Sequence, residues 1–174
     1  DIVGMVKSVT IPLHQLEDCF QNGKWFGGSS IEGFARIAES DMFLVPDPAT
    51  FAVVPWDREP NAVTAKVVCD VFNPDGTPFE GDPRHILRRA VQRAQALGYE
   101  FMTGPELEFF LFHADEIADG KYLTYDQAGY FDLSTDTASN IRKDMVNALE
   151  ELGILVETSH HEVALGQHEI DFEY

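Results

Sequence analysis

Two glutamates one residue apart, Glu106 and Glu108, lie in an otherwise strongly apolar stretch that runs from Gly104 to Phe112. Alternate side chains on a strand point to the same face, so the two carboxylates would project together. Carboxylates held side by side repel each other unless a proton or a cation lies between them. A hard divalent cation such as Mg²⁺ or Mn²⁺ satisfies this arrangement, because it prefers oxygen ligands. An acidic strand face that is simply solvated is the alternative interpretation.

A second acidic pair, Glu162 and Glu169, lies near the C-terminal end of the sequence and flanks Gly166. A glycine in a strand can introduce a kink or bulge that resets which face each side chain occupies. Four carboxylates from two strands would hold more than one hard cation. Paired cations are typical of phosphate chemistry, where they neutralise the charge of a transferring phosphoryl group.

Three histidines accompany the second acidic pair, namely His160, His161 and His168. Their spacing next to a glutamate is compatible with a zinc site. A structural role for the imidazoles is the interpretation that we favour.

The composition indicates a folded protein that avoids polyanions. Of 174 residues, 44% are hydrophobic and 13 are Phe, which is enough to build a core. The formal net charge is −18, from 30 acidic and 12 basic residues, and this argues against nucleic acid or an anionic membrane as a partner. Cys19 and Cys69 have neither metal-binding nor disulfide spacing, so free thiols are expected. No signal peptide and no membrane-length apolar run is visible, which predicts a cytoplasmic protein. The sequence opens with Asp1 and has no initiator Met, so we expect it to begin inside a longer chain.

Hydrophobic periodicity predicts a mixture of strands and helices. Strands are expected at residues 5–11, 43–48, 51–55, 64–72, 99–112 and 154–157, with a hairpin within 114–127. Apolar residues at helical spacing predict a short helix at residues 13–20. Asp82 and Pro83 form an N-terminal helix signal for residues 82–97, and Asp136 or Thr137 begins a second long helix that ends at Gly153.

Four motifs in this sequence resemble those of glutamine synthetase of the bacterial and archaeal type. They are FGGSSIEGF at residues 26–34 with ESDMFLVPDP at 39–48, NPDGTPFEGDPR at 73–84, GPELEFFLF at 104–112 and HHEVALGQHEIDF at 160–172. The motifs occur in the family order, and the resemblance extends from Asp1 to Tyr174 without large gaps.

The resemblance implies an α+β fold in two parts. Residues 1–80 would form a β-grasp-like domain that lacks its first strand and helix. Residues 81–174 would form the beginning of the catalytic α/β domain, in which helices accompany antiparallel active-site strands; this domain is guanido-kinase-like and unrelated to ATP-grasp. The family assembles as a dodecamer of two rings, with each active site built from two neighbouring subunits. Because a whole enzyme of the family is much longer, we expect this chain alone to be inactive and to form no stable rings.

The family uses ATP to join ammonia to L-glutamate, through a γ-glutamyl phosphate, with two or more Mg²⁺ or Mn²⁺ ions per site. By motif position, the metal ligands would be Glu106, Glu108, Glu162 and Glu169. Glu162 and Tyr130 would also form the catalytic ammonium pocket. Gly104 and Glu157 match nucleotide-binding positions, and Tyr174 lies near the position of the adenine.

Gly27 is the main departure from the family pattern, which has an aspartate after the phenylalanine of this motif. That aspartate helps to bind ammonium and to take its proton, and glycine has no carboxylate with which to do so. Two alternatives therefore stay open: a γ-glutamyl ligase for a larger amine, and a non-catalytic metal-binding module related to glutamine synthetase.

Overall fold

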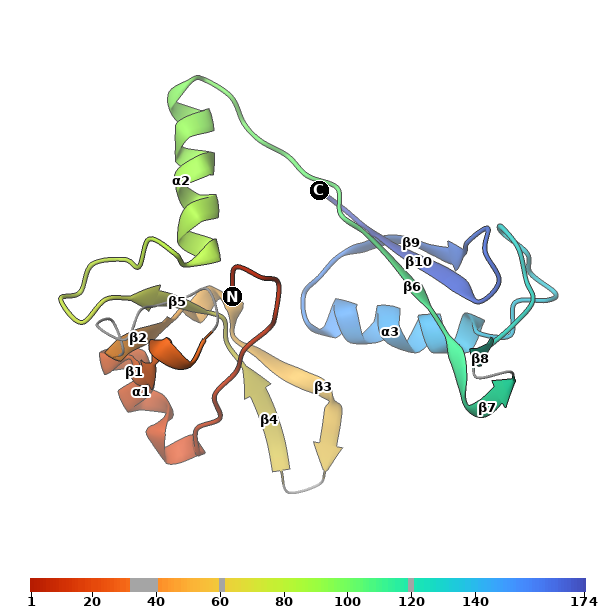
Figure 1. The fold of residues 1–174 in the computed structure, drawn as a ribbon, viewed down its shortest axis with the longest axis horizontal. Helices are drawn as coiled ribbons and strands as arrows, with labels where there is room; N and C mark the ends of the chain where they lie inside the picture. The colour runs from red at the N-terminus through yellow and green to blue at the C-terminus, as the bar shows by residue number, and fades with distance from the viewer. Residues whose placement is uncertain (32–40, 60–61, 119–120) are drawn as a thin grey trace. The chain divides into compact units, whose positions relative to one another are not determined.

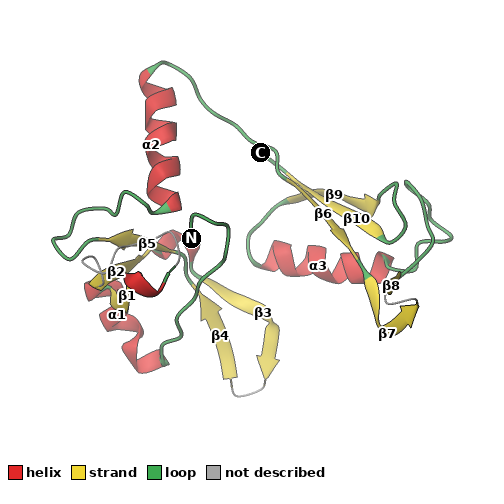
Figure 2. Ribbon diagram, in the orientation of Figure 1, coloured by secondary structure: helices red, strands yellow, loops and turns green. Residues whose placement is uncertain are grey.

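The computed structural model describes residues 1–31, 41–59, 62–118 and 121–174, and Figures 1 and 2 show the order of its elements. The chain divides into two compact units, residues 1–53 with 64–101 and residues 54–63 with 102–174. Both contain helices and antiparallel sheets, so the α+β class predicted from the sequence is confirmed. Within the described ranges, every helix is too short or too polar to cross a bilayer.

The first unit contains a three-stranded antiparallel sheet in the order β1–β2–β5. Its strands are β1 (Lys24–Gly27), β2 (Asp41–Pro46) and β5 (Cys69–Phe72), and Met42, Val71 and Phe79 form the buried core beside it. The predicted short helix is present as η1 (Leu13–Gln15) and α1 (Leu16–Asn22). Gly23 ends α1 at φ 73°, where a Cβ would lie 2.9 Å from the carbonyl oxygen of Leu44, so this turn requires glycine. Short 3-10 turns occupy η2 (Gly28–Ser30) and η4 (Pro48–Thr50).

The helix predicted at residues 82–97 is confirmed as α2 (Pro83–Ala96). Asp82 caps it, because its Oδ1 accepts a hydrogen bond of 3.2 Å from the amide of Arg84. The other carboxylate oxygen accepts from the amide of Val71 on β5, at 3.1 Å, and so ties the helix to the sheet. Arg84 forms ion pairs with Asp47 and Asp70, so the basic face of the helix serves structure.

Two strand predictions in this part of the chain were wrong. Residues 5–11 form no strand, and Val6 is 93% exposed, because an alternating pattern makes a strand only where a partner strand pairs with it. The single strand predicted at residues 64–72 is divided into β4 (Ala62–Lys66), which pairs with β3 (Ala52–Glu59), and β5, which pairs with β2. Residues 32–40, which include Glu32–Phe34 of the motif FGGSSIEGF, lie outside the described part.

The second unit is organised around the antiparallel sheet β6–β10–β9. It comprises β6 (Glu106–Phe110), β10 (Gln167–Phe172) and β9 (Val156–His161), and α3 (Ser139–Glu151) packs against β9 and β10 (Figure 1). The predicted hairpin is present as β7 (Phe112–Ala118) and β8 (Lys121–Thr124). Residues 99–105, predicted as the first half of the glutamate strand, precede β6 without joining the sheet.

Candidate active site

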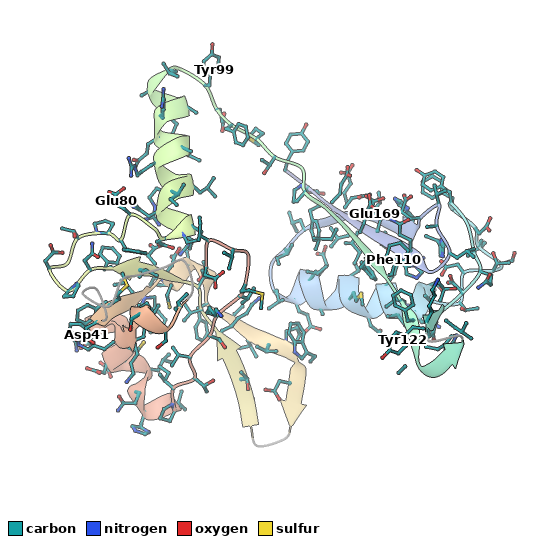
Figure 3. All side chains as sticks on the ribbon, viewed as in Figure 1. Asp41, Glu80, Tyr99, Phe110, Tyr122 and Glu169 are labelled. Atoms are coloured by element: carbon teal, nitrogen blue, oxygen red, sulfur yellow. The ribbon has the colours of Figure 1, made fainter. Side chains whose placement is uncertain are left out.

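One face of the β6–β10–β9 sheet is acidic, and we call it the acidic face. Glu108 lies directly opposite Glu169 across the β6–β10 ladder, and Glu106 lies opposite Asp171. Residues opposite each other in an antiparallel pair point to the same side, so these carboxylates share one face. On β9, His160 is the ladder partner of Glu169, which is labelled in Figure 3, so His160 joins the same face. The register in which the three strands pair is therefore what brings these side chains to one face of the sheet.

Glu162 completes this carboxylate group from the position just after β9. Burial first, and then the hydrogen bond with Glu162 and the charge of Asp171, together raise the pKa of Glu169 from 4.5 to about 7. His160 opposes this rise, since its Nδ1 lies 3.6 Å from Glu162 and its Nε2 lies 3.5 Å from Glu169. Carboxylates this close need a proton or a cation between them.

The turn between Glu162 and Glu169 depends on Gly166. This glycine has φ 69°, and a Cβ there would lie 2.9 Å from Thr124 Cβ and 3.0 Å from the carbonyl oxygen of Leu111. Only glycine fits such a turn without displacing β8. The next residue, Gln167, donates from its side-chain amide to Glu108 at 2.6 Å, which fixes one carboxylate oxygen. The glycine that the sequence analysis singled out thus sets the direction of β10.

The four predicted metal ligands occupy the acidic face or its edge. Glu108 is the ladder partner of Glu169 and Glu162 is hydrogen-bonded to it, whereas Glu106 lies one pair further along, opposite Asp171. The sequence analysis did not select Asp171, although the alternation Glu169–Asp171 on one strand is the signal that would have found it. His160, Glu169 and Asp171 place one ligand atom each within 4.8 Å of one another.

A pocket of about 210 Å³ adjoins the acidic face and contains all three predicted nucleotide residues. Gly104, Glu157 and Tyr174 line it, together with Glu106 and Asp171 of the acidic face. The ring of Tyr174 lies 4.0 Å from where a Cβ on Gly104 would be. Ligand pockets commonly measure about 300–1,000 Å³, so this space suits part of a nucleotide.

Tyr130 and Glu162, the predicted catalytic pair, both lie next to His160. The ring of Tyr130 meets His160 edge-on at 5.6 Å and stacks on Phe131 at 4.0 Å between centroids. Phe131 has φ 57°, which is uncommon for a residue other than glycine, and its amide donates to the carbonyl of His161 at 3.2 Å. Tyr130 thus comes from a constrained segment that is bonded to the end of β9.

Gly27 ends β1 in the first unit, and it is exposed. Its ladder partner is Asp41, the first residue of β2. Partners in an antiparallel pair lie on the same face, so a carboxylate of the neighbouring strand stands beside the position that has no side chain.

Comparison of the whole sequence with protein families matches two profiles. Residues 1–74 match the glutamine synthetase β-grasp domain, and residues 80–174 match the glutamine synthetase catalytic domain. The acidic face and its pocket fall entirely within the second match.

Glutamine synthetases from Clostridium saccharobutylicum, Halobacterium salinarum and Methanosarcina mazei are 54%, 51% and 49% identical to this chain over all of its length. The chain spans 38–39% of the length of these relatives.

Solved structures agree with this similarity. GmaS without ligand matches 99% of this chain, and 40% of its own, with a TM-score of 0.79 at 26% identity. A cryo-EM structure of Plasmodium falciparum glutamine synthetase matches 94% of this chain and 37% of its own, with a TM-score of 0.71; at 24% identity this shows a likeness of fold.

Proposed function

Because this chain belongs to the glutamine synthetase family, we propose that it supplies metal-binding strands and part of the nucleotide site for ATP-dependent ligation of ammonia to L-glutamate. The observation that carries the proposal is the surroundings of Glu169: Glu108 is its ladder partner, and burial, the hydrogen bond with Glu162 and the charge of Asp171 raise the pKa of Glu169 to about 7. A freely solvated acidic strand would not raise the pKa of one of its carboxyl groups in this way.

The donor set fits a hard divalent cation, because every proposed ligand is a carboxylate oxygen. Glu108, Glu162 and Glu169 would hold one ion. Glu106 would help to hold another, and its place in both the acidic face and the pocket lining supports a role beside the nucleotide phosphates. When bound there, Mg²⁺ or Mn²⁺ would neutralise the charge that keeps glutamate and the terminal phosphate of ATP apart.

The remaining proposed residues bind and orient the substrates. The carboxylate of Glu162 would accept a hydrogen bond from ammonium, and the exposed ring of Tyr130 would offer its negative face to the same cation. Gly104 and Glu157 would contact the nucleotide, with Tyr174 beside the adenine. The γ-carboxylate of glutamate would then attack the terminal phosphate, release ADP and form γ-glutamyl phosphate, from which ammonia displaces phosphate.

Calorimetric titration of the chain with Mn²⁺ tests the metal site. Glu108→Gln should weaken binding by about tenfold or more, since even the outer partners of a metal site are worth roughly 10–100-fold. Glu173→Gln is the matched control, because it removes the same charge from an exposed residue just beyond β10 and should leave the affinity within about twofold. Equal effects of the two substitutions would count against a specific site.

A γ-glutamyl ligase for a larger amine is the second candidate, and Gly27 is the observation that favours it. Without a carboxylate at this position, ammonium would lose a partner, although Asp41 stands on the neighbouring strand. Ammonia and polyamines can be offered as competing amines to the full-length protein that the gene encodes. Identifying the amide that forms then separates the ammonia ligase from the ligase for a larger amine. Preference for ammonia supports glutamine formation, and preference for a polyamine supports the second candidate.

A further inference from the structure

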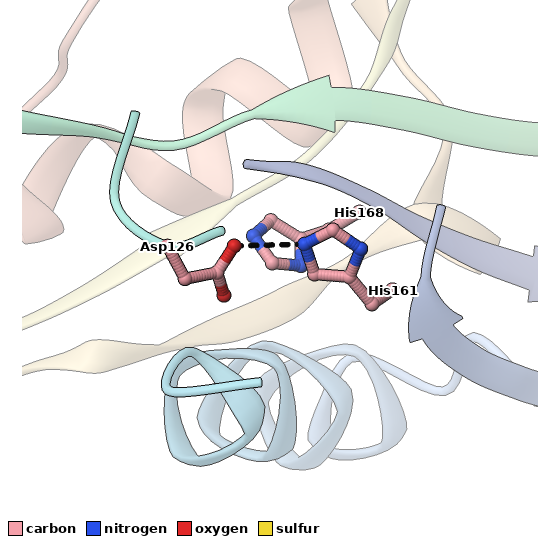
Figure 4. Close-up of side chains that lie close together, drawn as sticks. All are labelled: Asp126, His161 and His168. Carbon is pink, nitrogen blue, oxygen red and sulfur yellow. Dashed lines mark hydrogen bonds and ion pairs between the residues drawn. The ribbon is translucent and has the colours of Figure 1, made fainter. Parts of the chain in front are cut away.

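A buried polar layer lies in the second unit, outside the residues assigned above. Asp126, His161 and His168 are 6%, 1% and 0% exposed, and they place one ligand atom each within 4.8 Å of one another (Figure 4). Burying polar groups is costly unless each one is bonded. The bonds within this layer therefore indicate what it holds together.

His161 makes three bonds that join two separate segments. Its Nε2 lies 2.8 Å from Oδ1 of Asp126, and its Nδ1 lies 2.6 Å from the carbonyl oxygen of Glu162. Its own carbonyl accepts from the amide of Phe131 at 3.2 Å. Asp126 and Phe131 bracket the segment that carries Tyr130, so one residue contacts both ends of that segment and the backbone of Glu162.

We propose that His161 is a positioning residue which, held by Asp126, sets the place of Tyr130 relative to Glu162. Both ring nitrogens face oxygen atoms, one on Asp126 and one on Glu162, so the orientation of the ring is fixed from two sides. The inference rests on the proposed function, in which Tyr130 and Glu162 receive the amine. A small displacement between two groups that hold one small ligand weakens its binding steeply.

His168 is bonded differently, and this makes it a matched comparison. Its Nδ1 accepts from Nη1 of Arg142 at 2.9 Å, and Arg142 is bonded in turn to Asp136 at the start of α3. Burial lowers the pKa of His168 below its ordinary value of 6.5, and the charge of Arg142 lowers it further, so the ring is neutral. We call the bonded pair Asp126 and His161 the clamp. Within the described ranges the Nε2 of His168 makes no hydrogen bond, so His168 lies next to the clamp without belonging to it.

A bound metal is the competing explanation of this layer, because its three residues each offer one ligand atom. Elemental analysis of the purified chain separates the two explanations. A transition metal present at about one per chain would overturn the positioning role.

Two variants separate positioning from general stability. Asp126→Asn keeps the shape but removes the charge that holds His161, and it should speed hydrogen exchange at the Phe131 amide by about tenfold; His168→Gln should lower the melting temperature and leave that exchange within about twofold. In the full-length product of the gene, Asp126→Asn should raise the KM for the amine by about tenfold with a smaller change in kcat, whereas His168→Gln should leave KM unchanged.

The outcomes distinguish this proposal from the function on which it rests. Unchanged Phe131 exchange in Asp126→Asn, or equal exchange effects of the two variants, would overturn the positioning role. Faster exchange together with no ligase activity in the unsubstituted full-length protein would leave the clamp standing and remove the proposed function. An unchanged amine KM in an active Asp126→Asn enzyme would show that the clamp has no bearing on substrate.

Discussion

Glu169 has the most constrained chemistry of any carboxylate on the acidic face. It faces Glu108 across the ladder, bonds to Glu162 and lies near His160, while being largely buried. Burial, the hydrogen bond with Glu162 and the charge of Asp171 favour its neutral form, His160 favours its charged form, and the net result is a pKa of about 7. A divalent cation that binds here must therefore compete with a proton.

This competition predicts a pH dependence of metal stabilisation. The folded pKa lies above the ordinary value of 4.5, so the contribution of protonated Glu169 to stability is complete below pH 4.5 and is lost as the pH rises through about 7. Mn²⁺ should accordingly raise the melting temperature more at about pH 8 than at about pH 6, because at the higher pH it displaces no proton. Thermal melts with and without Mn²⁺ measure the difference.

Glu169→Gln is the control for this prediction. The glutamine has no proton to displace, so the pH dependence of the Mn²⁺ shift should largely disappear while a smaller shift remains from Glu108 and Glu162. An equal Mn²⁺ shift at the two pH values in the unsubstituted chain would contradict the assignment of the raised pKa to the metal site.

Among the elements, local signals predicted the helices, and long-range pairing decided the strands. Asp82 and Pro83 predict the start of α2 from the sequence, and the side chain of Asp82 does cap this helix. Alternation predicted that Glu106 and Glu108 share a face, but it could not reveal that β10 lies between β6 and β9. The segment at residues 5–11 shows the limit of the method, because it alternates well and has no partner strand.

The clamp around His161 was beyond the reach of sequence patterns for the same reason. Asp126 lies in an irregular segment after β8, where no periodicity predicts the direction of a side chain, and its partner is far along the chain. The histidines themselves were visible in the sequence, and two of them, His161 and His168, are buried. The sequence could not show that His161 contacts the backbone of Phe131 and of Glu162.

The tie between α2 and β5 gives a prediction at this scale. Asp82→Ala removes the acceptor for the amides of both Arg84 and Val71, so it should lower the free energy of unfolding by about 1–3 kcal/mol. Asp82→Asn keeps one acceptor oxygen and should cost less than the alanine. Urea denaturation followed by circular dichroism measures both, and an alanine variant as stable as the unsubstituted chain would refute the bridging role.

Across the whole molecule, much apolar surface is uncovered. On α2 alone, Ile86, Leu87 and Leu97 are 42%, 61% and 67% exposed, although they lie on one helical stripe. Exposed apolar patches of this kind promote association. We therefore predict that the 174-residue chain self-associates in solution without a fixed stoichiometry.

Light scattering over a range of concentrations tests this prediction. The average mass should rise continuously with concentration, and Leu87→Glu on the exposed face of α2 should reduce the rise. A single closed assembly of constant mass, such as a dodecamer, would contradict it.

The central claim is that the acidic face binds a divalent cation, and anomalous diffraction from crystals of the chain soaked in Mn²⁺ tests it most directly. The account predicts a manganese peak bonded to carboxylate oxygens of Glu108, Glu162 and Glu169, at the roughly 2.0–2.6 Å expected for hard cations and oxygen ligands. An acidic face with no such peak, or manganese held by Asp126, His161 and His168 instead, would contradict the account.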